Sequence, residues 1–546
     1  MATLTTVCEV TFDSGIEYYS FDGIAAPAAF YEPYIRNVRT IDREAPVTGA
    51  GYRISDLEIE FINWEQYFTK KKGGTAPGKY FYNRPIRLLY GDVASGLAAM
   101  TEIFRGRIQR WHATEDGAFV VSARDISYDR FRVCVHSAGK TLNTTTFPDL
   151  PVGTEPRLVP IIYGTNDVDS SVNLVTYDLG GPIPCYLIDT DAAGKWRYVV
   201  ASHVCKSVIN VFVYGVKTAA AGYTVTTASY GGVTMQVVDF TVDPRNTARS
   251  GELEVTASVS GITDDGLSTG TLLTHPCDIL EHLLKNYVNT TAAEIGATFA
   301  SMKALTSTYA IGLPILDKDN SWEVIIDRWC GSILGSFYAS RTGTFDVYIK
   351  TSAAPVASST LYTHDGEIVE GSLRIDSNEE VLSEIHYDWL RIWPRDFFGT
   401  RSSLTVSNQD VTLNADIPKH IDFWYVRDST TATNVANAYA DLLREEVEYV
   451  TLELMPDLAD DVDLNTVVDI SHWQGTGTSG YDDVIVRIYA ISLTLTPTEK
   501  RVEIKALKLF QSPNNSMIRP RLSAAMIRPH FGLITQQIRP RIFKNV

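Results

Sequence analysis

At 546 residues, the chain is too long for one ordinary hydrophobic core, so its length predicts three to five domains. An apolar share of 45% with 21% charged residues is typical of a globular protein and argues against a largely disordered one. The formal net charge of −17 argues against a general nucleic-acid-binding surface, because attraction to phosphates needs clustered lysine and arginine.

The sequence also lacks the common targeting signals. It has no run of about 18 apolar residues that could span a bilayer, and its first residues carry neither a basic segment nor an apolar h-region. The six cysteines lie far apart without a CxxC pair. This spacing favours reduced, mostly buried thiols in a protein made in the cytosol.

Residues 1–140 form the first predicted unit, which is rich in β-strands. Apolar and polar residues alternate from Leu4 to Phe12 and again from Ile54 to Trp64, and an apolar run extends from Arg84 to Tyr90. The clearest hairpin runs from Ile103 to Ile126, around the Asp-Gly turn at Asp116 and Gly117. This pattern predicts an antiparallel barrel.

Residues 141–265 form a second predicted unit. A linker rich in threonine and proline opens it, and many short strands follow, of which Val208 to Tyr214 and Leu253 to Val259 are the strongest. Glycine and serine turns separate these strands, as in a small all-β domain.

Helical spacing appears first in the third unit, residues 266–355. Cys277 to Tyr287 repeats apolar residues at helical intervals, and Pro276 suits the first turn. A second helix is expected from Ser321 to Leu334 with Ser321 as its N-cap, followed by a strand from Thr344 to Lys350. This unit is predicted to be a small α+β domain.

Residues 356–511 form the fourth unit. Strand-like runs extend from Leu361 to Trp393, and a helix is expected after the capping cluster Asp428 to Thr431. Four strands should follow, at 450–454, 467–470, 484–495 and 502–509. This pattern predicts one helix laid over a second small antiparallel barrel. The first and fourth units share a rough plan, which suggests an internal duplication.

The last segment, residues 512–546, repeats an Ile-Arg-Pro motif three times. It has no Asp or Glu after Pro513, and it carries six Arg and Lys. Proline favours extended geometry in the residue before it, so the segment is predicted to be an extended basic strip that docks on another chain. The alternative is a frayed terminus with accidental similarity. The predicted docking residues are Ile518, Arg519, Pro520, Ile527, Arg528, Pro529, Ile538, Arg539 and Pro540.

The sequence carries no recognisable catalytic signature. The chain has no HExxH motif and no GxSxG nucleophile elbow, and its ten histidines are scattered singly. Asp457, Asp460, Asp461 and Asp463 could hold a cation, although loop acids are usually only solvated. The sequence therefore predicts a protein that is not an enzyme, with no catalytic residues, no metal and no cofactor.

The order of these features resembles the baseplate hub, or tail tip, proteins of long-tailed bacteriophages. Ile103 to Ile108 with Val120 to Asp125 looks like the hairpin of the first hub barrel, and Val159 to Gly164 looks like the start of an inserted β domain. Trp322 to Lys350 is similar to the small α+β domain of that family, and Leu452 to Leu458 to its second barrel. The likeness covers most of residues 1–510.

The resemblance implies a mainly β, multidomain fold with α+β parts: two related antiparallel hub barrels, an inserted all-β domain, a small α+β domain and an extended C-terminal tail. It implies a structural virion protein of the tail baseplate, assembled in the host cytoplasm. A homotrimeric ring would adapt the six-fold tail tube to a three-fold tip and form part of the DNA ejection channel.

The partners implied are the distal tail protein, the tape-measure protein and tip or tail-fibre proteins. DNA would be present only in transit, and no stable membrane insertion is expected. Some hubs of this kind hold an iron–sulfur cluster through four cysteines, but only Cys185 and Cys205 lie moderately close here, so no cluster is expected. Two alternatives remain, a tail-associated cell-wall hydrolase and a receptor-binding or carbohydrate-binding tail protein.

Overall fold

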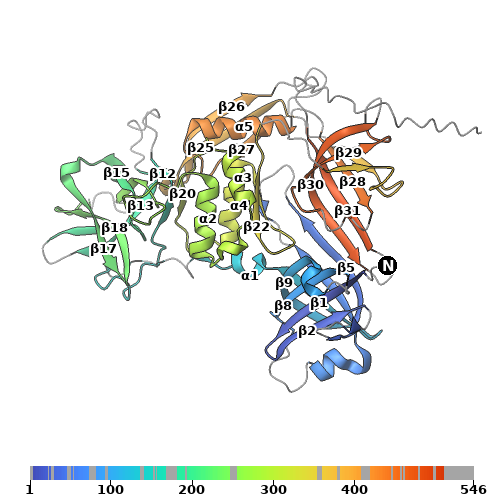
Figure 1. Ribbon diagram of the computed structural model, residues 1–546. Coiled ribbons are helices and arrows are strands. Elements are labelled where there is room, and N and C mark those ends of the chain that lie inside the picture. The colour runs from blue at the N-terminus through green and yellow to red at the C-terminus, as the bar shows by residue number, and fades with distance from the viewer. Residues whose placement is uncertain are drawn as a thin grey trace, which may run out of the picture. The chain divides into compact units, whose positions relative to one another are not determined.

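A computed structural model describes most of the compact unit Met1–Phe510. The described residues are 4–21, 24–25, 30–45, 51–52, 55–72, 81–92, 96–135, 140–151, 154, 156–167, 181–190, 194–245, 255–352, 360–377, 382–406, 418–443, 447–455, 458, 462–476, 480–495 and 500–509. They build a mainly β, multidomain fold with several sheets and a few helices, which confirms the predicted fold class (Figure 1).

Seven strands of the N-terminal region form one sheet in the order β2-β1-β8-β9-β10-β7-β5. Cys8 and Val10 of the first strand point into the core, as the predicted alternation requires. The predicted hairpin is confirmed, and Gly117 supplies the positive φ of its turn. The bounds are β1 Leu4–Phe12, β2 Gly15–Ser20, β5 Ile35–Glu44, β7 Asp56–Ile62, β8 Pro85–Asp92, β9 Thr101–Ala113 and β10 Ala118–Asp125.

A parallel contact closes this sheet into a barrel. Ser20 N donates to Glu32 O at 2.9 Å, and Glu32 N donates to Tyr18 O at 3.0 Å. The segment that carries Glu32 runs directly into β5, whose other neighbour is β7. One stretch of chain therefore joins the two ends of the strand order, so backbone groups at both ends find partners.

The second barrel closes in the same manner. Its strands follow the order β29-β30-β31-β28-β24. The segment from β23 to β24 closes this barrel. It pairs in parallel with β29 through β23, forms a bridge between Ile368 and Leu454, and pairs with β28 through β24. The bounds are β23 Leu361–Thr363, β24 Arg374–Ser377, β28 Glu448–Leu454, β29 Val467–His472, β30 Tyr481–Leu495 and β31 Lys500–Lys508. This shared closing device favours the internal duplication that the sequence suggests.

The two barrels are joined into one sheet by antiparallel pairing of β5 with β30, which we term the seam. Ala490 pairs with Glu44, Leu493 with Ile41, and Leu495 with Val38. One hydrophobic core extends across both barrels, with Ile59 and Val121 in the first and Val450 and Ile504 in the second. Sequence reasoning predicted two barrels but not the strand pair that connects them.

The all-β domain forms one eight-stranded sheet in the order β16-β15-β19-β13-β14-β18-β17, with β12 beside β19. Its start is held by close backbone crossings. A Cβ at Gly164 would lie 2.0 Å from Ile311 O, and one at Gly261 would lie 2.0 Å from Ile162 O. The bounds are β12 Thr165–Asn166, β13 Ile183–Thr190, β14 Trp196–Ala201, β15 Ser207–Val213, β16 Val216–Lys217, β17 Tyr223–Tyr230, β18 Val233–Phe240 and β19 Val255–Ser260.

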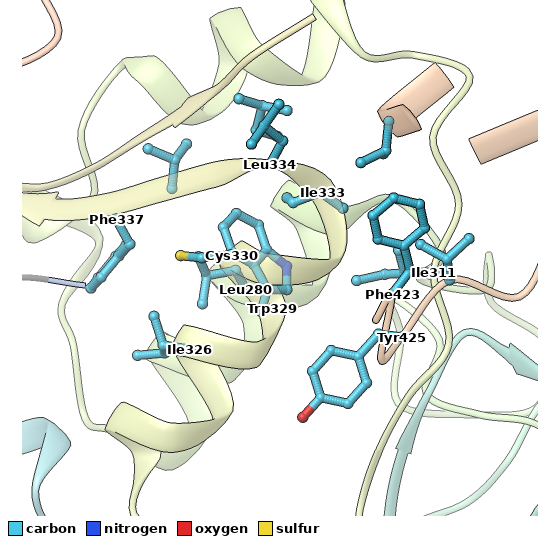
Figure 2. Packing of buried hydrophobic residues seen from close by; sticks show 14 of the residues in the cluster. Leu280, Ile311, Ile326, Trp329, Cys330, Ile333, Leu334, Phe337, Phe423 and Tyr425 are labelled. Carbon is cyan, nitrogen blue, oxygen red and sulfur yellow. The ribbon is translucent and has the colours of Figure 1, made fainter. Parts of the chain in front are cut away.

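Both predicted helices of the α+β region are confirmed as α2 Pro276–Tyr287 and α4 Trp322–Ile333, and α3 Thr298–Leu305 lies between them. The Ser321 side chain caps α4 by accepting from Val324 N. Trp329 Nε1 donates to Pro276 O at 3.1 Å, which ties α4 to the start of α2. Figure 2 shows Trp329 packed in the cluster that contains Leu280. The region also contains β11 Ile161–Tyr163, β20 Leu313–Ile315, β21 Gly335–Ala339 and β22 Phe345–Ile349.

The predicted C-terminal helix is present as α5 Ser429–Leu443, but its packing differs from the prediction. Its buried face, including Val435 and Tyr439, lies mainly against a separate three-stranded sheet of order β26-β25-β27, not over the second barrel. Thr431 at its start accepts from Ala310 N at 2.9 Å, which holds α5 to the α+β region. The sheet bounds are β25 Glu384–Ile392, β26 Phe397–Thr405 and β27 Pro418–Asp422.

Candidate assembly surfaces

The nine predicted docking residues of the Ile-Arg-Pro strip lie outside the described residues, so their docking role stays a prediction. The predicted domain boundaries at residues 140, 265, 355 and 511 also stay predictions. The surfaces below come from the described part of the chain.

A buried polar junction lies beside the seam. Arg43 of β5 is almost fully buried, and its Nη2 donates to Asp463 Oδ1 at 2.6 Å and to Ala339 O at 3.1 Å. These contacts link the first barrel with the loop before β29 and with the end of β21. The acidic loop that could hold a cation thus uses Asp463 in an ion pair, while its residues 457, 460 and 461 lie outside the described residues.

A second arginine strengthens the same junction. Arg487 of β30 donates to Asn465 Oδ1 at 2.6 Å, and its guanidinium lies 4.6 Å from the centre of the Tyr348 ring. Burial lowers the pKa of Arg487, because a guanidinium loses hydration inside the protein. Asn465 in turn donates to Ser336 Oγ. Polar groups from both barrels and the α+β region therefore meet at one buried place.

The first barrel also carries a groove of about 560 Å³ with charged walls. Arg124 pairs with Asp56 at 3.1 Å, and Arg39 pairs with Glu58 at 3.1 Å. Positive and negative side chains are balanced, which suits a polar protein contact better than a phosphate backbone. Its lining residues are Arg39, Asp42, Asp56, Leu57, Glu58, Tyr82, Gln109, Arg110, Ser122, Ala123, Arg124 and Tyr128.

Two charges in this groove stand apart from its ion pairs. The described contact of Arg110 is its Nε–H donation to Ser122 Oγ at 3.2 Å, and no salt bridge of Asp42 occurs among the described residues. Both side chains are exposed. Sequence reasoning missed the groove because its residues come from four strands, the turn at Tyr82 and the short helix that contains Tyr128, although the polar alternation along β7, β9 and β10 is visible in the sequence.

The outer face of the β26-β25-β27 sheet gathers charged and imidazole side chains. Arg401 forms two contacts of 2.8 Å with the Asp388 carboxylate. Arg401 lowers the pKa of Asp388, and His420 lowers it further. His420 Nε2 lies 3.3 Å from Asp388 Oδ2 and 3.3 Å from Asp422 Oδ1. Among the described residues these three, Asp388, His420 and Asp422, are the group whose ligand atoms could hold a metal ion.

The cysteines do not resemble activated thiols. Five of the six are buried, and burial raises the pKa of Cys8, Cys185 and Cys205 and raises that of Cys277 to about 12. A thiol held protonated is a poor nucleophile and a poor metal ligand.

No helix among the described residues is long and apolar enough to cross a bilayer.

Comparison with known proteins gives likeness of structure only. No family model matches the chain, and no curated protein matches it. A 43 kDa tail protein of prophage MuSo2 from Shewanella oneidensis is similar at 10% identity and a TM-score of 0.41, over 92% of this chain and 98% of that one.

Two further solved structures are similar over comparable lengths. A tail protein from Neisseria meningitidis MC58 has 9% identity and a TM-score of 0.36, over 92% of this chain and 96% of that one. The prophage tail protein gp18 from Listeria monocytogenes EGD-e has 7% identity and a TM-score of 0.39, over 93% and 95%.

Proposed function

We propose that this chain is a structural tail protein of a bacteriophage, the hub of the baseplate. Three copies form a ring that joins the six-fold tail tube to a three-fold tip and lines part of the DNA ejection channel. The distal tail protein, the tape-measure protein and tip or fibre proteins bind around it in the virion. Its role is mechanical, and no catalytic step is assigned to it.

The observation that carries the proposal is the seam. Two barrels that close by the same parallel contact are joined edge to edge in one chain through β5 and β30. Three such chains supply six similar barrels, and a six-fold tube can therefore meet a three-fold assembly with repeated contacts of one kind. A single barrel per chain would not give this match.

The charge of the groove fits contact between neighbouring subunits. Arg110 and Asp42 are opposite charges within one groove, so an adjacent copy with complementary groups can pair with both. The net charge of −17 also suits a channel along which DNA passes without adhering.

The test is the symmetry of the purified full chain. We expect a mass of three times 60.5 kDa by light scattering, and class averages in electron microscopy with three-fold symmetry around an axial channel. A monomer at all concentrations, or a ring without three-fold symmetry, would rule out the hub. A lytic band in zymography of the same preparation would favour the cell-wall hydrolase instead.

A pair of matched variants tests the groove. Arg110→Glu reverses a charge in the groove and should weaken the trimer, shifting the mass towards monomer at low concentration. Arg501→Glu reverses an exposed charge on β31 and should leave the mass unchanged. If the two variants have the same mass at each concentration, the groove is not part of the contact between subunits.

A further inference from the structure

The polar face of the β26-β25-β27 sheet brings together a ligand set that no part of the hub function uses. Asp388 lies on β25, and His420 and Asp422 lie on the neighbouring β27. In the parallel register of these strands Asp388 pairs with Asp422 and His386 with His420. Side chains two residues apart on a strand share a face, so all four project to the same side of the sheet.

The alternation also explains why this face is polar. Ile385 and Tyr387, the intervening residues of β25, are buried in the core beneath α5. Asp388 is nearly buried, while His420 and Asp422 are each close to half exposed. Two ligands thus remain open to solvent, and the third is held in place by the sheet.

The distances between the ligand atoms match those within a metal site. His420 Nε2 is 3.3 Å from Asp388 Oδ2 and 3.3 Å from Asp422 Oδ1. A tetrahedral zinc ion with bonds of about 2.0–2.1 Å separates its ligands by about 3.3–3.4 Å. Both separations are longer than the usual N–H···O hydrogen bond of about 2.9–3.0 Å. The two measured separations therefore fit an ion shared by the imidazole and each carboxylate, and the three ligand atoms all lie within 4.8 Å of one another.

Arg401 does not block such an ion. Its Nε and Nη2 each lie 2.8 Å from one oxygen of Asp388, a two-pronged contact that fixes the carboxylate plane. A carboxylate oxygen has a second lone pair, so Asp388 Oδ2 can accept from Arg401 and also face His420. Outer groups that orient a ligand in this manner are usual around metal sites.

The mixed ligand set selects the kind of ion. One imidazole nitrogen with two carboxylate oxygens suits a borderline divalent ion such as zinc, whereas calcium and magnesium favour oxygen ligands alone. We infer that Asp388, His420 and Asp422 form a zinc-binding site that clamps strand β27 to strand β25. This inference does not depend on the hub function, because it rests on one sheet within one chain.

A zinc titration of the untagged full chain tests the proposed site. The protein is first treated with a chelator and dialysed. We expect calorimetry with zinc chloride to show one site per chain, and zinc to raise the unfolding temperature of the protein. His420→Ala and Asp422→Asn should each weaken zinc binding by at least about 10-fold. Both residues are substantially exposed, and circular dichroism of each variant checks that the fold is kept.

His112→Ala is the matched control, since His112 is an exposed histidine on β9, far along the chain from β27. It should bind zinc with the wild-type affinity. The inference fails if the wild-type chain binds no zinc, or if His420→Ala binds zinc as tightly as His112→Ala. The second result would place the bound zinc elsewhere on the chain.

Discussion

Arg43 Nη2 lies 2.6 Å from Asp463 Oδ1, although 420 residues separate the two in sequence. The same nitrogen donates to Ala339 O, so one guanidinium holds three regions of the chain together. Buried arginines are costly to desolvate and stay buried only when well paired. The pair therefore marks a place where the barrels and the α+β region are fixed to each other.

Replacing Arg43 should destabilise the protein measurably. Arg43→Met keeps the aliphatic length but leaves Asp463 and Ala339 O without their donor, so we expect a loss of about 2–3 kcal/mol in the free energy of unfolding. Urea unfolding followed by fluorescence measures it.

Arg39→Met is the control on the same strand. Arg39 is about half exposed, and its partner Glu60 keeps a second contact of 2.8 Å with Arg36. This substitution should cost less than about 1 kcal/mol. If both variants lose the same free energy of unfolding, the contacts of Arg43 stabilise the protein no more than an exposed ion pair does.

Stability should fall in mild acid because of His203. This imidazole is partly buried, and the loss of hydration lowers its pKa to about 4, below the value of 6.5 in an unfolded chain. Between those values the unfolded chain binds the extra proton, so stability decreases as the pH falls from about 6.5 to about 4. Burial also lowers the pKa of His275 and His282, which act in the same direction.

The variant His203→Gln separates this histidine from the others. His203 Nε2 accepts from Ile162 N at 2.9 Å, a role that a glutamine oxygen can take. We expect the variant to be less stable than the wild type at pH 8 and to lose less stability on acidification, by up to about 3 kcal/mol. Parallel curves of unfolding temperature against pH for the two proteins would contradict this.

The crossing at Gly261 should tolerate no side chain. A Cβ there would lie 2.0 Å from Ile162 O, a backbone atom that cannot rotate away. We expect Gly261→Ala to cost about 3 kcal/mol and to loosen the start of the all-β domain, which hydrogen exchange of β12 and β19 would detect. At Gly366 the nearest atom to a Cβ is a side-chain oxygen at 3.5 Å, so Gly366→Ala should be nearly neutral.

Removal of residues 513–546 tests the predicted docking strip. The truncated chain should unfold at the same temperature as the full chain and assemble from the same number of copies, because the described core ends before this segment. Virion assembly should stop at the step that adds the partner. A variant with Arg519, Arg528 and Arg539 replaced by alanine should show the same block, and normal assembly of both would exclude a docking role.

Local sequence patterns identified most elements, because their causes are local. The capping residues Ser321 and Asp428 and the turn at Gly117 act within a few residues, so the helices α4 and α5 and the hairpin β9–β10 could be predicted. The packing of α5 was misjudged, since an apolar helical face does not state which sheet will cover it. The partner proved to be β25 and β26.

The candidate surfaces were harder to foresee, because they depend on pairing between distant strands. His420 and Asp388 are 32 positions apart, and only the parallel register of β25 with β27 places them together. The pairing of β5 with β30 is more distant still. The sequence of neither strand indicates its partner. The alternation of apolar and polar residues specifies which face of a strand is buried, but not which strand lies alongside.

The seam also means that β5 is synthesised long before the strand that pairs with it. The outer edge of β5 pairs with residues 490–495, so about 450 further residues must be made before that edge can be covered. At about 5–20 residues per second, this takes about 20–90 seconds, during which an unpaired strand is open to aggregation. Arg39, Asp42, Arg43 and Glu44 place alternating charges along that edge. These charges would discourage a wrong strand from pairing until the chain's own β30 emerges from the ribosome.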